Sequence, residues 1–276
     1  MLKLRILTAL VLAPLVILLV LYAPSWLFAL VMGQLFLMGG WEWCRLAGWQ
    51  SKFVQASFLV LLLISMLLFW FFPTLNGLIE PLLYVTSVGW LLHLWLLKSY
   101  ARRGLHGLAL LDFPGWHLLT GWFLLVIPWL AMVKLQASQP EGHWIMLFLM
   151  VLIWVADVAA YFTGKRFGKH KLAPNLSPGK TLEGVAGAIL FSSLFALAAS
   201  FWLQAGHKSL LFVLVAQSTV IFSIAGDLLE SMYKREVGLK DSGTLLPGHG
   251  GVLDRIDSLT AAAPLFYTGY SLLLLS

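Results

Sequence analysis

Nine runs of 17–20 mostly apolar residues follow one another along this chain of 276 residues. A helix needs about 20 such residues to cross the hydrocarbon core of a bilayer, so each run is a candidate span. In composition, 60% of the residues are hydrophobic and 11% are charged, whereas soluble domains carry about 45–50% and about 25%. The sequence therefore predicts an all-α polytopic membrane protein and excludes a soluble globule, a disordered chain, a coiled coil and a collagen-like chain. The predicted spans cover residues 6–22, 24–40, 54–72, 81–97, 116–133, 144–163, 184–203, 209–226 and 259–275.

The positively charged residues predict the orientation of these spans. With the N-terminus in the cytoplasm, sixteen of the 18 Lys and Arg fall on the cytoplasmic side, and only Lys134 and Lys208 fall on the other. Such an excess is typical of cytoplasmic loops, so the net charge of +6 does not indicate nucleic acid as a partner. No small-residue cleavage site follows the first run at 22–24, and we expect this run to remain as a helix rather than to be a signal peptide.

The acidic residues predict where the function resides. Eight of the 12 Asp and Glu lie between Asp157 and Asp257, although charged side chains near membrane segments are costly and usually face a cavity or a partner. We therefore expect a featureless N-terminal region of about five spans, residues 1–143, and a catalytic C-terminal region of about four spans, residues 144–276. The single cysteine, Cys44, excludes an internal disulfide and a cysteine-rich metal site.

The first polar cluster lies at the end of the sixth span and in the loop that we expect after it. Asp157, Tyr161 and Gly164 recur at i, i+4 and i+7, so they share one helical face. Lys180 and Thr181 follow a Ser-Pro-Gly turn that leads into a helix start, where backbone N–H groups attract anions. This pattern predicts contact with phosphate; it is not a P-loop, which would need glycine at position 174.

The second polar cluster closes the eighth span. If the helix continues beyond the apolar run, Asp227, Ser231 and Lys234 share a face at i, i+4 and i+7, with Arg235 beside them. Carboxylate oxygens favour Mg²⁺, and Lys and Arg neutralise phosphate oxygens. The cluster therefore predicts a site for a metal ion and a phosphate group.

The third polar cluster combines acids, bases and a glycine-rich turn. Its members are Lys240, Asp241, His249, Gly250, Gly251, Asp254, Arg255 and Asp257. Glycines let the backbone of such a turn approach a ligand closely. Asp254 and Asp257 stand at i and i+3, so one helical turn can present both carboxylates to one cation. We expect His249 to orient a phosphate or to shape the turn.

Together these clusters resemble the signature of the phosphatidate cytidylyltransferase family, whose members are also called CDP-diacylglycerol synthases. The resemblance rests on Ser231-x-x-Lys234-Arg235, Lys240-Asp241 and Pro247-x-His249-Gly250-Gly251-x-x-Asp254-Arg255-x-Asp257, a stretch of 27 residues with fixed spacing. The earlier segment from Asp157 to Ser-Pro-x-Lys-Thr-x-Glu-Gly is similar to the same family, and it adds Glu183. Gly179 departs from the pattern, because many relatives carry Lys there. The length and the number of spans agree with a resemblance over the whole chain.

The resemblance implies a reaction in which CTP and phosphatidic acid give CDP-diacylglycerol and pyrophosphate for phospholipid biosynthesis. It also implies Mg²⁺ as one or two ions, a cytoplasm-facing polar cavity within the bilayer of the inner cell membrane, contact with membrane lipids and, as a compatible state, a homodimer. The lipid phosphate is already ionised near pH 7, since its second pKa is about 6, and no strong general base is required. Metal ions, Lys and Arg are the groups that such a transfer needs.

On this basis we assign expected roles to the residues of the three clusters. Catalytic roles are expected for Asp227, Ser231, Lys234, Arg235, Lys240, Asp241, His249, Asp254, Arg255 and Asp257. Substrate contacts are expected from Asp157, Lys180, Thr181, Glu183, Gly250 and Gly251. Within the catalytic set, the metal ligands are expected to be Asp227, Asp254 and Asp257.

Other functions fit the sequence less well. A CTP-dependent polyprenol kinase would share the nucleotide and membrane features, but it would transfer the γ-phosphate, so its products differ. A transporter would spread its acidic residues over several spans and both faces, whereas here they concentrate on one side. A CDP-alcohol phosphotransferase would carry an Asp-x-x-Asp-Gly motif followed by Ala-Arg, which this chain lacks. A scaffold without chemistry would not need so many ionisable residues in one signature.

Overall fold

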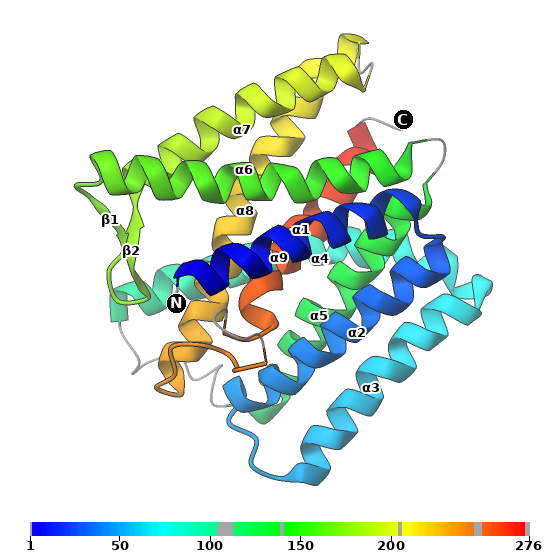
Figure 1. Ribbon diagram of the computed structural model, residues 1–276. Helices are drawn as coiled ribbons and strands as arrows, with labels where there is room; N and C mark the ends of the chain where they lie inside the picture. The colour runs from blue at the N-terminus through cyan, green and yellow to red at the C-terminus, as the bar shows by residue number, and fades with distance from the viewer. Residues whose placement is uncertain (1, 104–112, 139–140, 204–205, 246–249, 274–276) are drawn as a thin grey trace.

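The computed structural model of the chain describes residues 2–103, 113–138, 141–203, 206–245 and 250–273. Over these residues it forms nine α-helices, two short 3₁₀ helices (Pro73–Leu75 and Gly206–Lys208) and one two-stranded sheet (Figure 1). The α-helices are α1 (Leu2–Tyr22), α2 (Ser25–Leu46), α3 (Lys52–Phe71), α4 (Asn76–Arg103), α5 (Pro114–Ala137), α6 (Gly142–Phe167), α7 (Leu182–Trp202), α8 (Ser209–Glu236) and α9 (Leu253–Leu273). The strands are β1 (Lys171–Ala173) and β2 (Ser177–Thr181).

Each α-helix of the described residues overlaps one of the nine predicted apolar runs. Seven of them, α2 to α8, are long and apolar enough to cross a membrane, and the apolar part of α1 is the shorter segment Leu12–Tyr22. In lipid, every backbone N–H and C=O must find a partner within the segment, and only a helix achieves this for a single run. The prediction of an all-α polytopic membrane protein is confirmed.

Helix α8 continues well beyond its predicted apolar run, which ended at residue 226. It reaches Glu236, and its last ten residues include Asp227, Ser231 and Lys234. The condition for these three side chains to share a helical face is therefore met. Polar residues continue the helix here because they face charged partners from other elements instead of lipid.

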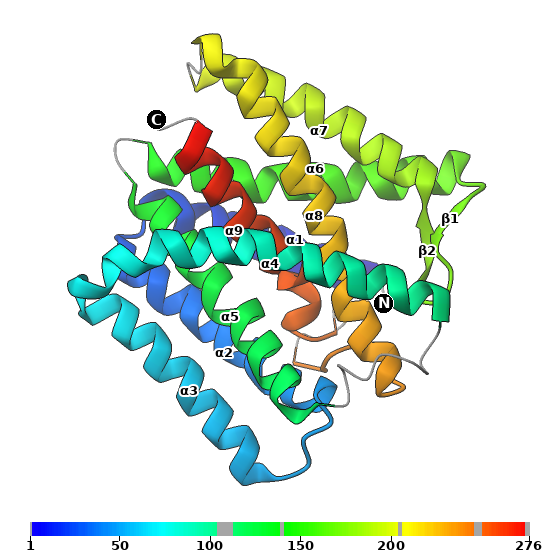
Figure 2. The ribbon, with the colours of Figure 1, turned by 180° about the vertical axis from the view of Figure 1, so that it is seen from behind.

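The helices pack in neighbouring pairs that bring α8 and α9 together in the middle of the molecule (Figures 1 and 2). Helix α6 packs along α7, α4 and α5 pack against α9, and α2 packs against α5. Helix α3 lies at the outer edge, where the large apolar side chains of Val60, Leu63 and Ile64 are exposed. Such a surface suits contact with lipid. The polar segments meet elsewhere, near the first turns of α9.

Small residues let α6 and α7 approach each other closely. A Cβ atom at Gly184 would stand 2.9 Å from the carbonyl oxygen of Ala160, and one at Gly187 would collide with the side chain of Thr163. Glycine or alanine at such positions is a common means of close helix contact in membranes. The packing fixes the end of α6 against the start of α7, where the hairpin emerges.

A β-hairpin joins α6 to α7, where the sequence led us to expect a loop. Strands β1 and β2 pair antiparallel with Lys171 opposite Thr181, and the turn between them buries Leu176. Thr181 also caps α7, since its Oγ1 accepts a hydrogen bond from the N–H of Gly184 at 3.1 Å. The strands are short and β2 contains Pro178, so their residues carry little of the usual strand signal. The expectation of a plain loop was therefore wrong for this segment.

Candidate active site

A cavity of about 680 Å³ lies where the hairpin, α6, α8 and α9 meet. Ten charged side chains line it, five acidic and five basic. The acidic ones are Asp157, Asp227, Asp241, Asp254 and Asp257, and the basic ones are Lys165, Lys171, Lys180, Lys234 and Arg255. The chain thus contains a polar cavity at the place where the three polar clusters converge. Tyr161, Gly164 and Thr181 of the first cluster line it too.

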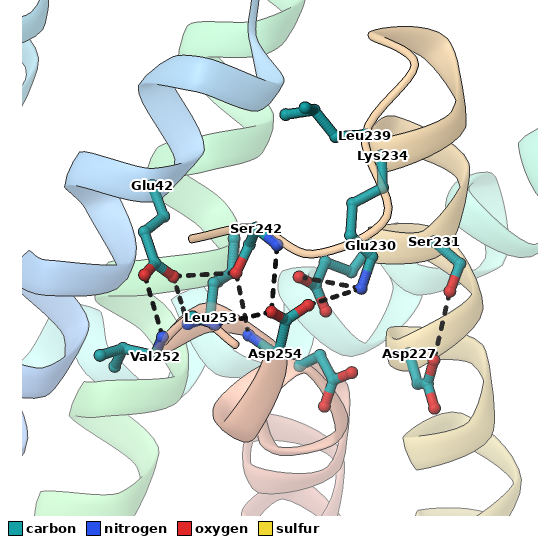
Figure 3. A network of polar contacts seen from close by, with 12 residues as sticks. Glu42, Asp227, Glu230, Ser231, Lys234, Leu239, Ser242, Val252, Leu253 and Asp254 are labelled. Atoms are coloured by element: carbon teal, nitrogen blue, oxygen red, sulfur yellow. Dashed lines mark hydrogen bonds and ion pairs between the residues drawn. The ribbon is translucent and has the colours of Figure 1, made fainter. Parts of the chain in front are cut away.

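One wall of the cavity joins the hairpin to α8 through an ion pair. Lys180 Nζ lies 2.6 Å from Asp227 Oδ2, and both side chains keep access to the cavity. Ser231 Oγ donates to Asp227 Oδ1 at 3.4 Å, from one turn further along α8 (Figure 3). The sequence predicted Lys180 at a phosphate-binding helix start. In the structure Lys180 lies near the end of β2, and its ammonium group lies beside the Asp227 carboxylate of α8. Both groups remain available to a ligand in the cavity.

Asp254, in the first turn of α9, is the centre of a hydrogen-bond network (Figure 3). Its Oδ1 accepts from Lys234 Nζ at 2.7 Å, and its Oδ2 accepts from the N–H groups of Ser242 and Gly251 at 3.0 and 2.8 Å. Burial favours the neutral acid, but these hydrogen bonds and the charge of Lys234 outweigh it and hold the pKa of Asp254 below its ordinary value. Asp254 is therefore a fixed anion that holds Lys234 and the loop between α8 and α9.

Two buried acids that the sequence analysis did not single out belong to the same network. Glu230, with 4% of its surface exposed, places its carboxylate 3.4 Å from Lys234 Nζ, one helical turn away. Glu42 of α2, with 1% exposed, accepts hydrogen bonds from Ser242 Oγ and from the backbone of Val252 and Leu253 (Figure 3). The signal that could have found Glu230 is its i, i+4 spacing from Lys234. For Glu42 the only sequence signal is an acid between two Trp residues, just beyond the second apolar run.

Three predicted site residues, Arg235, Glu183 and Ser231, do not line the cavity but contact residues around it. Arg235 donates to the carbonyl oxygens of Leu176 in the hairpin turn and Leu239 beyond α8. Glu183, at the start of α7, accepts from the backbone N–H of His170 and lies 2.7 Å from its Nδ1. Ser231 donates to the lining residue Asp227 of the same helix. Arg235 and Glu183 tie the hairpin segment to α8 and α7.

The remaining predicted residues belong to the loop between α8 and α9. Lys240 is exposed and is not among the lining residues. Gly250 has a φ of +82°, a left-handed conformation that favours glycine. Gly251 donates to Asp254 and has no room for a side chain beside Ser242 and Glu42. His249 lies outside the described residues, so its expected role stays a prediction.

The sequence matches a known family over nearly its whole length. Residues 3–273 fit the profile of the Cytidylyltransferase family. The chain belongs to this family. It is 42% identical over 269 residues to the phosphatidate cytidylyltransferase of Pseudomonas aeruginosa, covering 96% of both chains. It is 36% identical to that of Haemophilus influenzae, covering 96% of this chain and 97% of the relative. The relative from Staphylococcus epidermidis, of the same name, is 44% identical over 128 residues, 46% of this chain and 49% of the relative.

The donor chemistry of this cytidylyltransferase cavity fits a hard cation, although its carboxylates do not form a closed metal cage. Among the described residues, no group of three His, Cys, Asp or Glu stands close enough to hold a metal ion by itself. Mg²⁺ usually keeps several waters and binds through one or two carboxylates plus substrate phosphates. Asp227 and Asp257 line the cavity and fit that requirement. Asp227 pairs with Lys180, but both side chains are partly exposed, whereas the Asp254 side chain is only 8% exposed and is held by a buried lysine and two backbone N–H groups.

Proposed function

We propose that this chain transfers the cytidylyl group of CTP to phosphatidic acid, giving CDP-diacylglycerol and pyrophosphate for phospholipid biosynthesis. The observation that carries this function is the match, at 42% identity over 96% of both chains, to a relative named phosphatidate cytidylyltransferase. The cavity supports it because both substrates are polyanions. Five cationic side chains can neutralise their phosphates, and carboxylates stand beside them for a metal ion.

The reaction needs little covalent chemistry from the protein. An ionised oxygen of the lipid phosphate attacks the α-phosphorus of CTP and forms a new P–O bond. The bond from the α-phosphorus to the oxygen that bridges to the β-phosphate breaks, and pyrophosphate leaves with that electron pair. Lys180, Lys234 and Arg255 are proposed to bind the triphosphate and the lipid phosphate, because positioning and charge neutralisation dominate such transfers. No residue is required to remove a proton, since the lipid phosphate is already ionised.

Mg²⁺, as one or two ions, is the proposed cofactor. Asp227 and Asp257 are the carboxylates that would hold it, and bound Mg²⁺ would neutralise charge on the triphosphate and on the leaving pyrophosphate. Asp254 stays in the predicted metal set as a weaker candidate, because a metal ion there would have to displace a buried lysine, Lys234, whereas the lysine paired with Asp227 is partly exposed. Its hydrogen bonds support a role in holding Lys234 at the cavity.

We also propose an orientation in the membrane. The distribution of Lys and Arg supports a cytoplasmic N-terminus and a cavity that opens to the cytoplasm, where CTP is found. The bacterial relatives support the inner membrane as the location. A homodimer remains an expectation from the family resemblance.

The proposed reaction is tested by turnover of purified protein in detergent with α-³²P-CTP, phosphatidic acid and either Mg²⁺ or EDTA. We expect labelled lipid and equimolar pyrophosphate with Mg²⁺ and neither with EDTA. The Asp227→Asn variant, purified from the same host, measures the background of contaminating enzyme. Label released as CDP, with no labelled lipid, would overturn the proposal in favour of a CTP-dependent lipid kinase.

A further inference from the structure

Glu42 is a buried carboxylate in the half of the chain that the sequence left without a function. It lies on α2, 200 residues from its partner Ser242, and its side chain has almost no access to solvent or lipid. Its Oε2 accepts from Ser242 Oγ at 2.9 Å and from the Leu253 N–H at 2.7 Å, and its Oε1 accepts from the Val252 N–H at 3.0 Å. A charge buried so deeply is stable only when it is hydrogen-bonded in this way.

The described parts of the loop between α8 and α9, residues 237–245 and 250–252, pack against this carboxylate (Figure 3). A Cβ atom at Gly243 or at Gly251 would collide with the carboxylate of Glu42. The N–H groups that donate to Glu42 belong to Val252 and Leu253, at the start of α9. The first amides of a helix have no partner within it, and the helix dipole favours a negative charge there. The two described parts of the loop therefore both contact one side chain from a helix that is distant in the sequence.

The contacts continue from Glu42 to the cavity in two steps. Ser242 Oγ, which donates to Glu42, accepts from the Asp254 N–H at 3.3 Å, and the Ser242 N–H donates to Asp254 Oδ2 at 3.0 Å. Asp254 in turn holds Lys234 Nζ at 2.7 Å. Asp254 and Lys234 line the cavity, whereas Glu42 does not. Glu42 can thus affect a ligand only through the residues that it holds.

We infer that Glu42 is a positioning residue of the transfer reaction: it fixes the loop between α8 and α9 so that Asp254 and Lys234 face the phosphates in the cavity. This inference rests on the proposed function for its link to turnover. Its structural part, the fixing of the loop, is independent of which substrate the cavity takes. Both oxygens of Glu42 accept hydrogen bonds, whereas in Glu42→Gln the amide nitrogen cannot accept any, so one of the two acceptor positions is lost.

The first test measures the loop directly, without any substrate. Hydrogen–deuterium exchange is followed for the backbone amides of residues 250–258 in the wild type and in Glu42→Gln. We expect these amides to exchange at least about tenfold faster in the variant, because Val252 and Leu253 lose charge-assisted acceptors. The matched control is Glu141→Gln, the same change at an exposed acid. Exchange equal to that of the wild type would overturn the inference.

The second test links the loop to turnover. We expect kcat/KM for CTP in Glu42→Gln to fall about 10- to 100-fold, as is typical when an outer partner of a functional group is removed. Ser242→Ala interrupts the same path, so the double variant should lose little beyond the worse single variant, whereas independent effects would multiply. The positioning role would be overturned if the losses in kcat/KM of the two single variants multiplied in the double variant. It would also be overturned if Glu42→Gln kept full kcat/KM although its loop amides exchanged faster.

The two proposals can fail separately. If the wild type makes no CDP-lipid, the proposed function fails, while the exchange experiment still decides whether Glu42 fixes the loop. If the wild type makes CDP-lipid and Glu42→Gln matches it in exchange and turnover, only the inference about Glu42 fails.

Discussion

Two lysine–aspartate pairs of nearly equal length differ in how deeply they are buried. Lys234 Nζ lies 2.7 Å from Asp254 Oδ1, with 10% and 8% of the two side chains exposed. Lys180 Nζ lies 2.6 Å from Asp227 Oδ2, with 26% and 32% exposed. We predict that Lys234→Met and Lys180→Met both impair cytidylyl transfer, but that only Lys234→Met strongly lowers the free energy of unfolding.

The expected magnitudes follow from burial. Removing one partner of a buried ion pair costs about 3–5 kcal/mol, because the other charge stays buried without compensation. In Lys234→Met, Asp254 keeps its two backbone hydrogen bonds, but Glu230 loses the cation that lies 3.4 Å away. A pair that water still reaches contributes about 0–1 kcal/mol. The two variants should therefore differ by about 2–5 kcal/mol in free energy of unfolding.

The assay is reversible denaturant unfolding of the wild type and both variants in one detergent, with cytidylyl transfer measured on the same preparations. Methionine is used because it preserves the apolar stem of each lysine. Adding Glu230→Gln to Lys234→Met removes the buried carboxyl group that has lost its lysine and should restore part of the lost stability. Equal free energies of unfolding for the two single variants would refute the argument that burial separates the pairs.

Three further predictions concern the metal, the packing and the orientation. Asp227→Asn should abolish turnover at every Mg²⁺ concentration while the unfolding transition stays near that of the wild type; recovery of turnover at high Mg²⁺ would show that this carboxylate only strengthens metal binding. Gly187→Val should lower the free energy of unfolding by about 1–3 kcal/mol, since overpacking forces α6 and α7 apart; an unchanged denaturation midpoint would contradict the close packing. In a Cys44→Ala background, a membrane-impermeant maleimide should label Ala137→Cys but not Lys169→Cys from the non-cytoplasmic side, and the reverse pattern would invert the proposed topology.

The apolar runs determined the helices because the physics of a bilayer leaves a single run no other way to pair its backbone groups. Polar spacing was informative for the same reason. Asp227 and Ser231 had to share a face once α8 continued, and the contact between them in the structure follows directly from i, i+4 geometry. Nine of the sixteen predicted site residues line one cavity, because charged residues in a membrane protein have few places to go besides a common polar space.

Tertiary structure alone decided which charges meet. The sequence is compatible with Lys180 at a helix start, but in the structure the hairpin places Lys180 beside Asp227. No local pattern in the sequence predicts that ion pair. Asp254 and Asp257 stand three residues apart, yet the loop amides and Lys234 occupy the oxygens of Asp254. Glu42 is the clearest case, because its partners lie about 200 residues away and its own surroundings in the sequence are apolar. Long-range hydrogen bonds depend on how helices pack, and packing is set by side-chain shape across the whole bundle rather than by spacing within one segment.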